Sequence, residues 1–174
     1  MFPETGLPDA WERIWTPHRS RYLSKARRDG TVEQECPFCS AYTKESEYDL
    51  VVTRGETAYV VLNLYPYNAG HLLITPYRHF ADITTATDEE MLEVSHLTQQ
   101  AMVVLRKAAG AQGFNIGVNQ GAIAGTSVAE HLHQHIVPRW GGDTNFMPVI
   151  GRAKAMNQLL EETRELLKAA WADL

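Results

Sequence analysis

The stretch "EHLHQHIVPRW", residues 130–140, carries three of the seven histidines of this 174-residue chain. They are His131, His133 and His135, at every second position. Side chains alternate between the two faces of a β-strand, so this spacing puts the three imidazoles on one face, about 7 Å apart along the strand. On a helix His133 would point away from the other two. We therefore predict a strand over residues 131–138, ending at Pro138.

Three kinds of chemistry use such a row of imidazoles. Imidazole is a common zinc ligand, and three imidazoles can hold a catalytic ion. Imidazole is also a good nucleophile near neutral pH, and a neighbouring imidazole can hold its tautomer. Imidazoles can, thirdly, donate hydrogen bonds to phosphate oxygens. The alternative is a polar strand face without chemistry, which a lone histidine would favour much more strongly than three in register.

The segment directly before the histidines favours phosphate over metal. "NQGAIAGTSVAEH", residues 119–131, is rich in glycine, and glycine lets backbone N–H groups approach an anion closely. Asn119, Thr126 and Ser127 add side-chain donors. A phosphate cradle that leads into a nucleophile needs such a loop, whereas a three-histidine metal site does not.

Outward from this segment, strands dominate the middle of the chain and helices are inserted singly. Two β-rich runs flank the turn "TRGE" within residues 48–66, which predicts a hairpin, and a third strand follows over 71–76. Residues 87–110 are typical of an amphipathic helix with Thr87 and Glu90 as a capping box and Gly110 at its end. A strand over 114–121 and an amphipathic helix over 151–174 complete an α+β chain with antiparallel pairing.

Composition bounds the function. The chain is 44% hydrophobic and 21% charged with a formal net charge of −5, which argues against a general nucleic-acid or anionic-membrane surface. No apolar run approaches the roughly 18–20 residues that span a bilayer, and we see no secretory signal. The two cysteines stand together in "CPFC", so a reduced, cytoplasmic setting fits best. We expect an N-terminal helical arm over 1–35 and one domain over 36–174.

With these motifs in hand, the sequence resembles the histidine-triad (HIT) superfamily, whose signature is His-x-His-x-His followed by apolar residues. "VLNLYPYNAGHLLITPYRH" is similar to its strand–turn–strand segment and residues 114–140 to its catalytic segment. "LNLYPYNAGH" and "PRWGGDTNF" look most like a bacterial branch of diadenosine tetraphosphate phosphorylases, also called ATP adenylyltransferases. The resemblance implies a HIT-like fold, an antiparallel sheet flanked by helices, that pairs with a second subunit as a homodimer or a larger homo-oligomer.

The resemblance also implies roles for particular residues. His133 would be the nucleophile that forms a covalent adenylyl-histidine, His135 would orient it, and His71 would buttress the site. The nucleotide would be held by Asn63 at the ribose, by Asn119 and Thr126 or Ser127 at phosphate, and by a base pocket of Val61, Leu73 and Phe38. The family's usual Gly-Gln-Ser/Thr-Val-x-His is here the longer "GTSVAEH", so the choice between the two hydroxyls stays open.

The implied substrates are adenine nucleotides and dinucleoside polyphosphates, and the acceptor fixes the reaction. Inorganic phosphate would turn diadenosine tetraphosphate into ADP and ATP, and no metal is needed at the reacting phosphate for this scheme. Water as acceptor would make the chain a hydrolase, of dinucleoside polyphosphates or nucleoside phosphoramidates. A non-enzymatic nucleotide- or zinc-binding module is a third interpretation, which the intact triad and loop speak against.

Cys36 and Cys39 have the Cys-x2-Cys spacing of half a zinc site. The resemblance adds His79 and His131, as in zinc-bearing relatives, to give a structural Cys2His2 site. Such a site would tie the N-terminal segment to the catalytic strand. The alternative is a pair of reduced cysteines packed near the base pocket.

Overall fold

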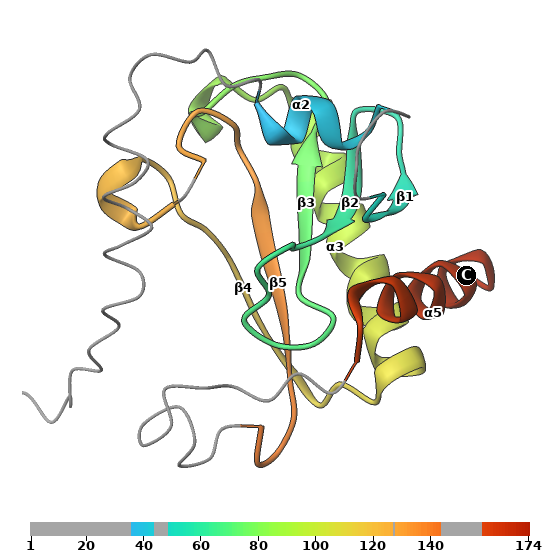
Figure 1. The fold of residues 1–174 in the computed structure, drawn as a ribbon. Coiled ribbons are helices and arrows are strands. Elements are labelled where there is room, and N and C mark those ends of the chain that lie inside the picture. Colours follow the sequence, from blue (N-terminus) through green and yellow to red (C-terminus); the bar gives the residue numbers. More distant parts are fainter. Residues whose placement is uncertain (1–35, 44–48, 127, 144–157) are drawn as a thin grey trace, which may run out of the picture. The chain divides into compact units, whose positions relative to one another are not determined.

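The computed structural model describes residues 36–43, 49–126, 128–143 and 158–174, and an antiparallel sheet forms the centre of this part of the chain (Figure 1). The strands lie in the order β1-β2-β3-β5-β4. Their bounds are β1 Val51–Arg54, β2 Ala58–Leu62, β3 Leu72–Pro76, β4 Gly113–Val118 and β5 Gln134–Arg139. The α+β class, the hairpin and the third strand are therefore confirmed.

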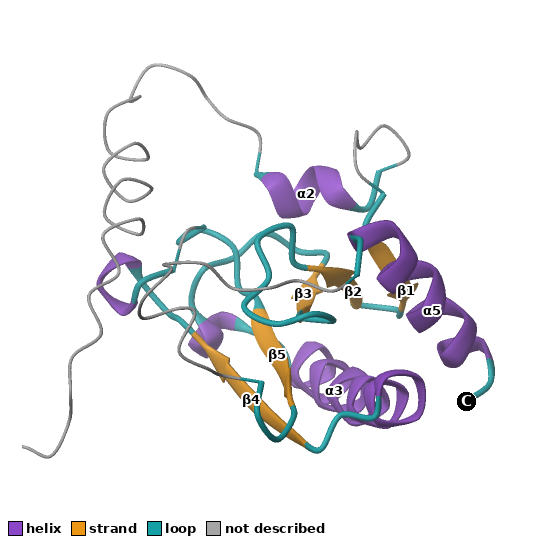
Figure 2. Ribbon diagram, turned by 60° about the horizontal axis from the view of Figure 1, so that its bottom comes forward, coloured by secondary structure: helices purple, strands orange, loops and turns teal. Residues whose placement is uncertain are grey.

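Helices cover the two faces of the sheet unequally. The long helix α3, Asp88–Ala109, packs on one face, and α5, Leu160–Ala172, packs against α3 and β1 (Figure 2). The short helix α2, Pro37–Ala41, lies on the opposite face, which Figure 1 shows from the front. Much of this second face is left without a helix among the described residues, so it is where a ligand could reach the sheet.

Local signals set the ends of α3 as predicted. The Thr87 hydroxyl accepts from the Glu90 N–H and the Glu90 carboxylate accepts from the Thr87 N–H, which is the predicted capping box. Gly110 ends the helix in the left-handed conformation, with φ of 63°, where a side chain would be strained. Arg78 donates to both oxygens of Glu90, so the start of α3 is also tied to the segment that follows β3.

The strand register determines which side chains share the open face. Val61 lies opposite Leu73, Leu73 opposite His135, and His135 opposite Gly117. Residues directly opposite in antiparallel strands point to the same side, so these four form one row across the sheet. The neighbouring Gln134 points to the other face and donates to the Thr98 hydroxyl of α3. The predicted alternation of His135 and Gln134 is thus confirmed.

The prediction of a strand over 131–138 was wrong at its start and one residue short at its end. β5 begins at Gln134, so His131 and His133 precede the strand and only His135 lies in it. The β3–β5 pairing stops at Ile74 and Gln134, two residues before Pro76, which has no N–H to offer a ladder. The N–H of Leu132 instead donates to the Phe80 carbonyl at 2.6 Å.

Several expectations fall on other parts of the chain. The helical arm over 1–35, the first residues of the helix predicted over 151–174, and Ser127 all lie outside the described residues. In the portion that is described, none of the helices has both the length and the apolar character required to cross a bilayer.

Candidate active site

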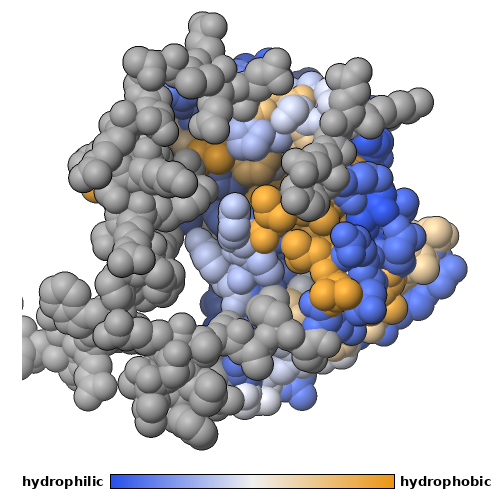
Figure 3. Space-filling model, viewed as in Figure 1, coloured by the Kyte–Doolittle hydropathy of each residue, from blue (hydrophilic) through white to orange (hydrophobic). Residues whose placement is uncertain are grey.

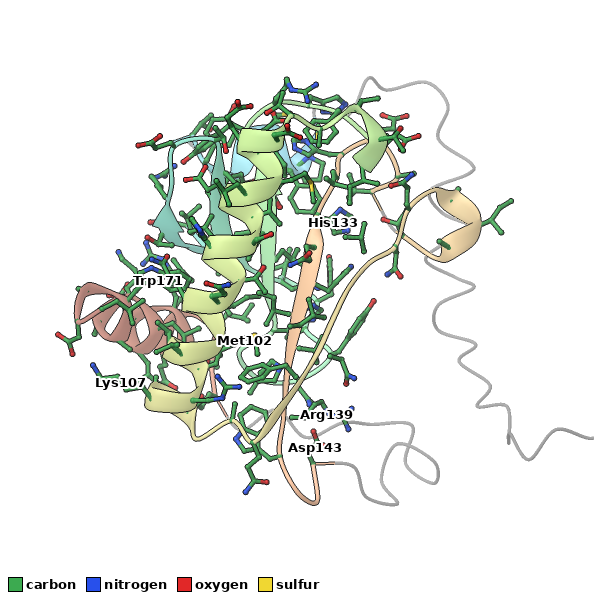
Figure 4. The ribbon with its side chains drawn as sticks, turned by 180° about the vertical axis from the view of Figure 1, so that it is seen from behind. Met102, Lys107, His133, Arg139, Asp143 and Trp171 are labelled. Atoms are coloured by element: carbon green, nitrogen blue, oxygen red, sulfur yellow. The ribbon has the colours of Figure 1, made fainter. Side chains whose placement is uncertain are left out.

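His133 occupies the turn into β5 and is held in one tautomer by the backbone (Figure 4). Its Nδ1 lies 2.8 Å from the carbonyl oxygen of His131, and a carbonyl can only accept. Nδ1 therefore carries the proton, and Nε2 keeps its lone pair. The side chain is 4% exposed, and burial lowers the pKa of His133, which favours the neutral ring. A neutral imidazole with a free Nε2 lone pair is a nucleophile in its active form.

His71 fixes the orientation and the tautomer of His135. The backbone N–H of Tyr67 donates to Nδ1 of His71 at 3.1 Å, so the proton of a neutral His71 must sit on Nε2. That Nε2 lies 3.0 Å from Nδ1 of His135, which must then accept. His135 is left with its proton on Nε2. This chain of two imidazoles begins at a backbone amide and therefore needs no charged group.

Burial keeps the His71 imidazole neutral. His71 is fully buried, and burial together with the neighbouring His135 and His133 lowers the pKa of His71 to about 3. The His133 and His135 ring centroids are 5.1 Å apart, so the two rings lie in contact and border one small volume. Tautomer control by a neighbouring group is the usual means of directing histidine chemistry.

Apolar side chains wall one side of this volume. The Phe38 ring on α2 lies 4.7 Å from His133, and Val61 and Leu73 lie in the row that contains His135. Figure 3 shows a patch of apolar side chains on this face of the molecule. Val61 and Leu73 are 6% and 5% exposed, so they also belong to the core. The sequence-predicted base-pocket residues are thus brought together around the histidines.

Asn63 lies directly after β2 and contacts His71. Its Nδ2 is 3.3 Å from Nδ1 of His71, and its Oδ1 accepts from the Tyr65 N–H at 3.0 Å. The side chain is half-buried, so one edge of the amide faces the site while the other is held by the turn. Asn63 therefore stands where the β2–β3 turn meets the imidazole chain.

The glycine-containing loop leaves β4 and returns to His131. Asn119 lines a cavity beside His135, at the start of the loop. Thr126 is 6% exposed, and its hydroxyl donates to the Val128 carbonyl at 3.1 Å. The hydroxyl proton of Thr126 is therefore used in a bond within the loop. Gln120 anchors the loop: its Oε1 accepts from the Ile83 N–H and its Nε2 donates to Asp82. No sequence signal had singled out Gln120.

Four candidate metal ligands converge at the other end of the site. The ligand atoms of Cys36, Cys39, His79 and His131 all lie within 4.8 Å of one another. Nδ1 of His131 is 3.2 Å and 3.6 Å from the two sulfurs, and Nδ1 of His79 is 3.3 Å from the Cys39 sulfur. Tetrahedral zinc with these ligands would set such N···S pairs about 3.6 Å apart.

The surroundings of His131 fit a metal ligand. Its Nε2 lies 2.9 Å from the Pro76 carbonyl oxygen, so Nε2 is the protonated nitrogen and the Nδ1 lone pair points to the cysteines. Burial, followed by contact with Cys36, raises the pKa of the Cys39 thiol, and a cation at this point would counter both effects. The donor set suits zinc, which would here supply a cross-link between α2, the segment after β3 and the triad.

Comparisons with known proteins agree with this geometry. A family model described as HIT domain matches residues 44–142. Over 171 residues the chain is 46% identical to a protein of Mycobacterium tuberculosis strain H37Rv named AP-4-A phosphorylase, with 96% of this chain and 88% of that protein covered. The fold and the histidines thus define a histidine-triad protein, and the chain belongs to the HIT family. The resemblance to the histidine-triad superfamily, inferred from the sequence, is confirmed.

Solved structures support the same fold. A zinc-bound histidine triad family protein from Mycobacterium smegmatis aligns with a TM-score of 0.67 and 28% identity, covering 80% of this chain and 94% of the other. A diadenosine triphosphate hydrolase from Plasmodium falciparum aligns with a TM-score of 0.59 over 89% and 95% of the two chains. At 18% identity the second likeness concerns the fold alone.

Proposed function

We propose that this chain is a nucleotidyltransferase that cleaves diadenosine tetraphosphate by phosphorolysis, giving ADP and ATP through an adenylyl-His133 intermediate. The observation that carries the proposal is the His133 ring, buried and neutral, with Nδ1 bonded to the His131 carbonyl and Nε2 left as the attacking atom. The 46% identity with AP-4-A phosphorylase over 96% of the chain supports the choice of substrate.

The reaction has two in-line displacements. In the first, the Nε2 lone pair of His133 forms a bond to the α-phosphorus, and the bond from that phosphorus to its bridging oxygen breaks, so that ATP leaves. In the second, an oxygen of inorganic phosphate attacks the same phosphorus, the P–N bond breaks, and ADP forms with the Nε2 lone pair restored. Splitting the transfer in this way replaces one difficult step by two easier ones.

The remaining residues of the site hold the substrate in place and stabilise charge on the reacting phosphate. His135, with its proton on Nε2, donates to an oxygen of the reacting phosphate, and Asn119 with Thr126 or Ser127 and the loop N–H groups stabilise the equatorial charge. Val61, Leu73 and Phe38 hold the adenine, and Asn63 holds the ribose. Zinc at Cys36, Cys39, His79 and His131 is structural in this scheme, which routes no step through a metal.

Hydrolysis by the same site is the second candidate, because water can replace phosphate as the acceptor. Incubation of the protein with diadenosine tetraphosphate, with and without inorganic phosphate, separates the two. ADP and ATP formed only with phosphate support phosphorolysis, whereas AMP and ATP in both tubes indicate a hydrolase. His133→Asn should abolish turnover and keep nucleotide binding; unchanged turnover would remove the nucleophile assignment, and a wild type that binds nucleotide without turnover would be a binding module.

The proposal extends to a homodimer in the reducing cytoplasm, where thiol ligands stay reduced. β4 is the last strand of the described sheet, and Ile116 on it is 44% exposed. An edge strand with an apolar side chain is a ready surface for pairing with a second copy. Light scattering should give twice the chain mass, and Ile116→Glu should give the mass of a single chain.

A further inference from the structure

A cavity of about 430 Å³ lies over β4 and β5 on the open face of the sheet, next to His135. Its lining includes Tyr67, Asn115, Gly117, Asn119, His135 and Arg139. Neither the base pocket nor the metal cluster uses this space. Its volume lies within the range that small-molecule sites occupy.

The charge of the lining argues against a second phosphate site. The cation Arg139 is paired within the protein. Its Nε and Nη2 donate to the Asp143 carboxylate at 2.6 and 2.9 Å, and its Nη1 donates to Asn115 Oδ1 at 2.8 Å. Figure 4 shows Arg139 and Asp143 together at the far end of β5 from His133. Among the lining residues that the structure describes, no other cation is present. The cavity therefore suits a neutral, polar ligand.

The side chains present are those that bind nucleobases. The Tyr67 ring lies nearly parallel to His135, at 12° and 5.9 Å between centroids, and Tyr67 is 45% exposed. Aromatic rings stack on bases of any sequence, and asparagine amides match the donor and acceptor edge of adenine. Asn115 supplies such an amide, while Asn119 of the same lining is the residue assigned to phosphate in the proposed reaction.

The position of the cavity links it to the reaction. Leu73 flanks His135 on one side and Gly117 on the other, so the base pocket and the cavity lie on opposite sides of the same imidazole. Along β5 the cavity runs from His135 to Arg139, about 13 Å at the rise of a strand. A polyphosphate that reaches the histidines from the base pocket would deliver its second end into this space.

We propose that the cavity between Tyr67 and Asn115 binds the second nucleoside of a dinucleoside polyphosphate, the one that departs with the leaving group. This inference rests on the proposed function for the identity of the substrate. It makes the site selective for a substrate with a nucleoside at both ends over one with a bare polyphosphate.

Equilibrium binding tests the inference without turnover. In protein carrying His133→Asn, calorimetry would compare diadenosine tetraphosphate with adenosine 5′-tetraphosphate, which lacks only the second nucleoside. Gly117→Ile is the perturbing change, because a Cβ at Gly117 meets nothing within 4 Å and the larger side chain enters the cavity. Gly113→Ala is the control, since Gly113 lies on the same strand outside the cavity lining and its added Cβ would meet only the Arg139 Cβ, at an ordinary contact distance of 3.8 Å. Asn115→Leu is a second, milder variant.

Gly117→Ile should raise the Kd for diadenosine tetraphosphate about tenfold, the scale of one lost base stack, and change that for adenosine 5′-tetraphosphate less than about twofold. Gly113→Ala should change neither Kd. Equal losses for both ligands, or no loss for either, would overturn the inference. The product analysis of the wild type is a separate measurement, so a failed function and a failed subsite give different results.

Discussion

Replacing His71 tests directly whether this residue sets the tautomer of His135. Two substitutions each keep one of the two ring hydrogen bonds of His71, the one from Tyr67 or the one to His135. His71→Asn leaves an amide near the Nδ1 position, which can still accept from the Tyr67 N–H but does not reach His135. His71→Gln extends an amide N–H toward the Nε2 position, from which it can donate to Nδ1 of His135. We expect His71→Asn to release the His135 tautomer and His71→Gln to keep much of it.

The size of the effect follows from the bond that is lost. The His71–His135 contact is 3.0 Å long and His71 is fully buried, so its removal leaves Nδ1 of His135 unsatisfied at about 1–3 kcal/mol. At about 1.4 kcal/mol per factor of ten, kcat should fall about 5- to 150-fold in His71→Asn, with KM little changed. His71→Gln should retain turnover within about fivefold of wild type.

Two measurements check the reasoning. Steady-state kinetics gives kcat and KM, and two-bond ¹H–¹⁵N correlation spectra report directly which nitrogen of each histidine is protonated. The wild type should show His71 and His135 protonated on Nε2. Because the pKa of His71 lies near 3, its ring should give the same neutral pattern throughout an assay range of about pH 6–9. A wild-type His135 protonated on Nδ1, or equal kcat values for the two variants, would refute the proposal that His71 sets the tautomer of His135.

Other expected outcomes concern zinc and the β1–β2 turn. Cys39→Ser should purify with well under one zinc per chain by metal analysis; a stoichiometric content would argue against the ligand set. The Glu93 carboxylate accepts from the N–H groups of Glu56, Thr57 and Ala58, so Glu93→Gln should cost about 1–3 kcal/mol and lower Tm by about 2–10 °C in calorimetry. Burial alone would raise the pKa of Glu93, but the hydrogen bond from the Thr57 hydroxyl and the three backbone bonds outweigh it and hold the pKa below its usual value. This stability should therefore be present at neutral pH and lost as pH falls through that pKa. Gly55→Ala should remove part of the same contribution, since its Cβ would meet Glu93 Oε1, and the double variant should be less destabilised than the sum.

Features that depend on local pattern could be predicted from the sequence. The capping box of Thr87 and Glu90 and the stop at Gly110 are short-range signals, and each stands where it was expected. The hairpin around Gly55 follows from two β-rich runs and a turn. The face of the sheet on which His135 lies could be predicted because alternation in strands is fixed by geometry, whereas His131 and His133 lie before the strand.

Features that depend on contacts between distant segments could not. Whether residues 131–133 join the strand is decided by a bond from Leu132 to Phe80, which no local pattern encodes. Nδ1 of His71 accepts a hydrogen bond from the backbone N–H of Tyr67, and a backbone amide carries no residue signature. Asp143, which pairs with Arg139 four residues before it, also accepts from Nδ2 of the distant Asn68, and that second contact appears only when the strands are assembled.

The four candidate metal ligands and His133 are joined by a short path of contacts. Cys36 is the N-cap of α2 and Cys39 lies within this helix, whose Phe38 ring lies 4.7 Å from the His133 ring, while His131 offers Nδ1 to the cysteines and its carbonyl to His133. His131 thus points its side chain to the cysteine sulfurs and holds, with its backbone carbonyl, the tautomer of the histidine proposed as nucleophile. The Tyr59 hydroxyl, buried beneath α2, donates to the Phe38 carbonyl at 2.7 Å and ties this helix to the core. A metal bound here would therefore act on catalysis through the position of Phe38 and the His131 carbonyl, because none of the four ligand side chains contacts the reacting phosphorus in the proposed scheme.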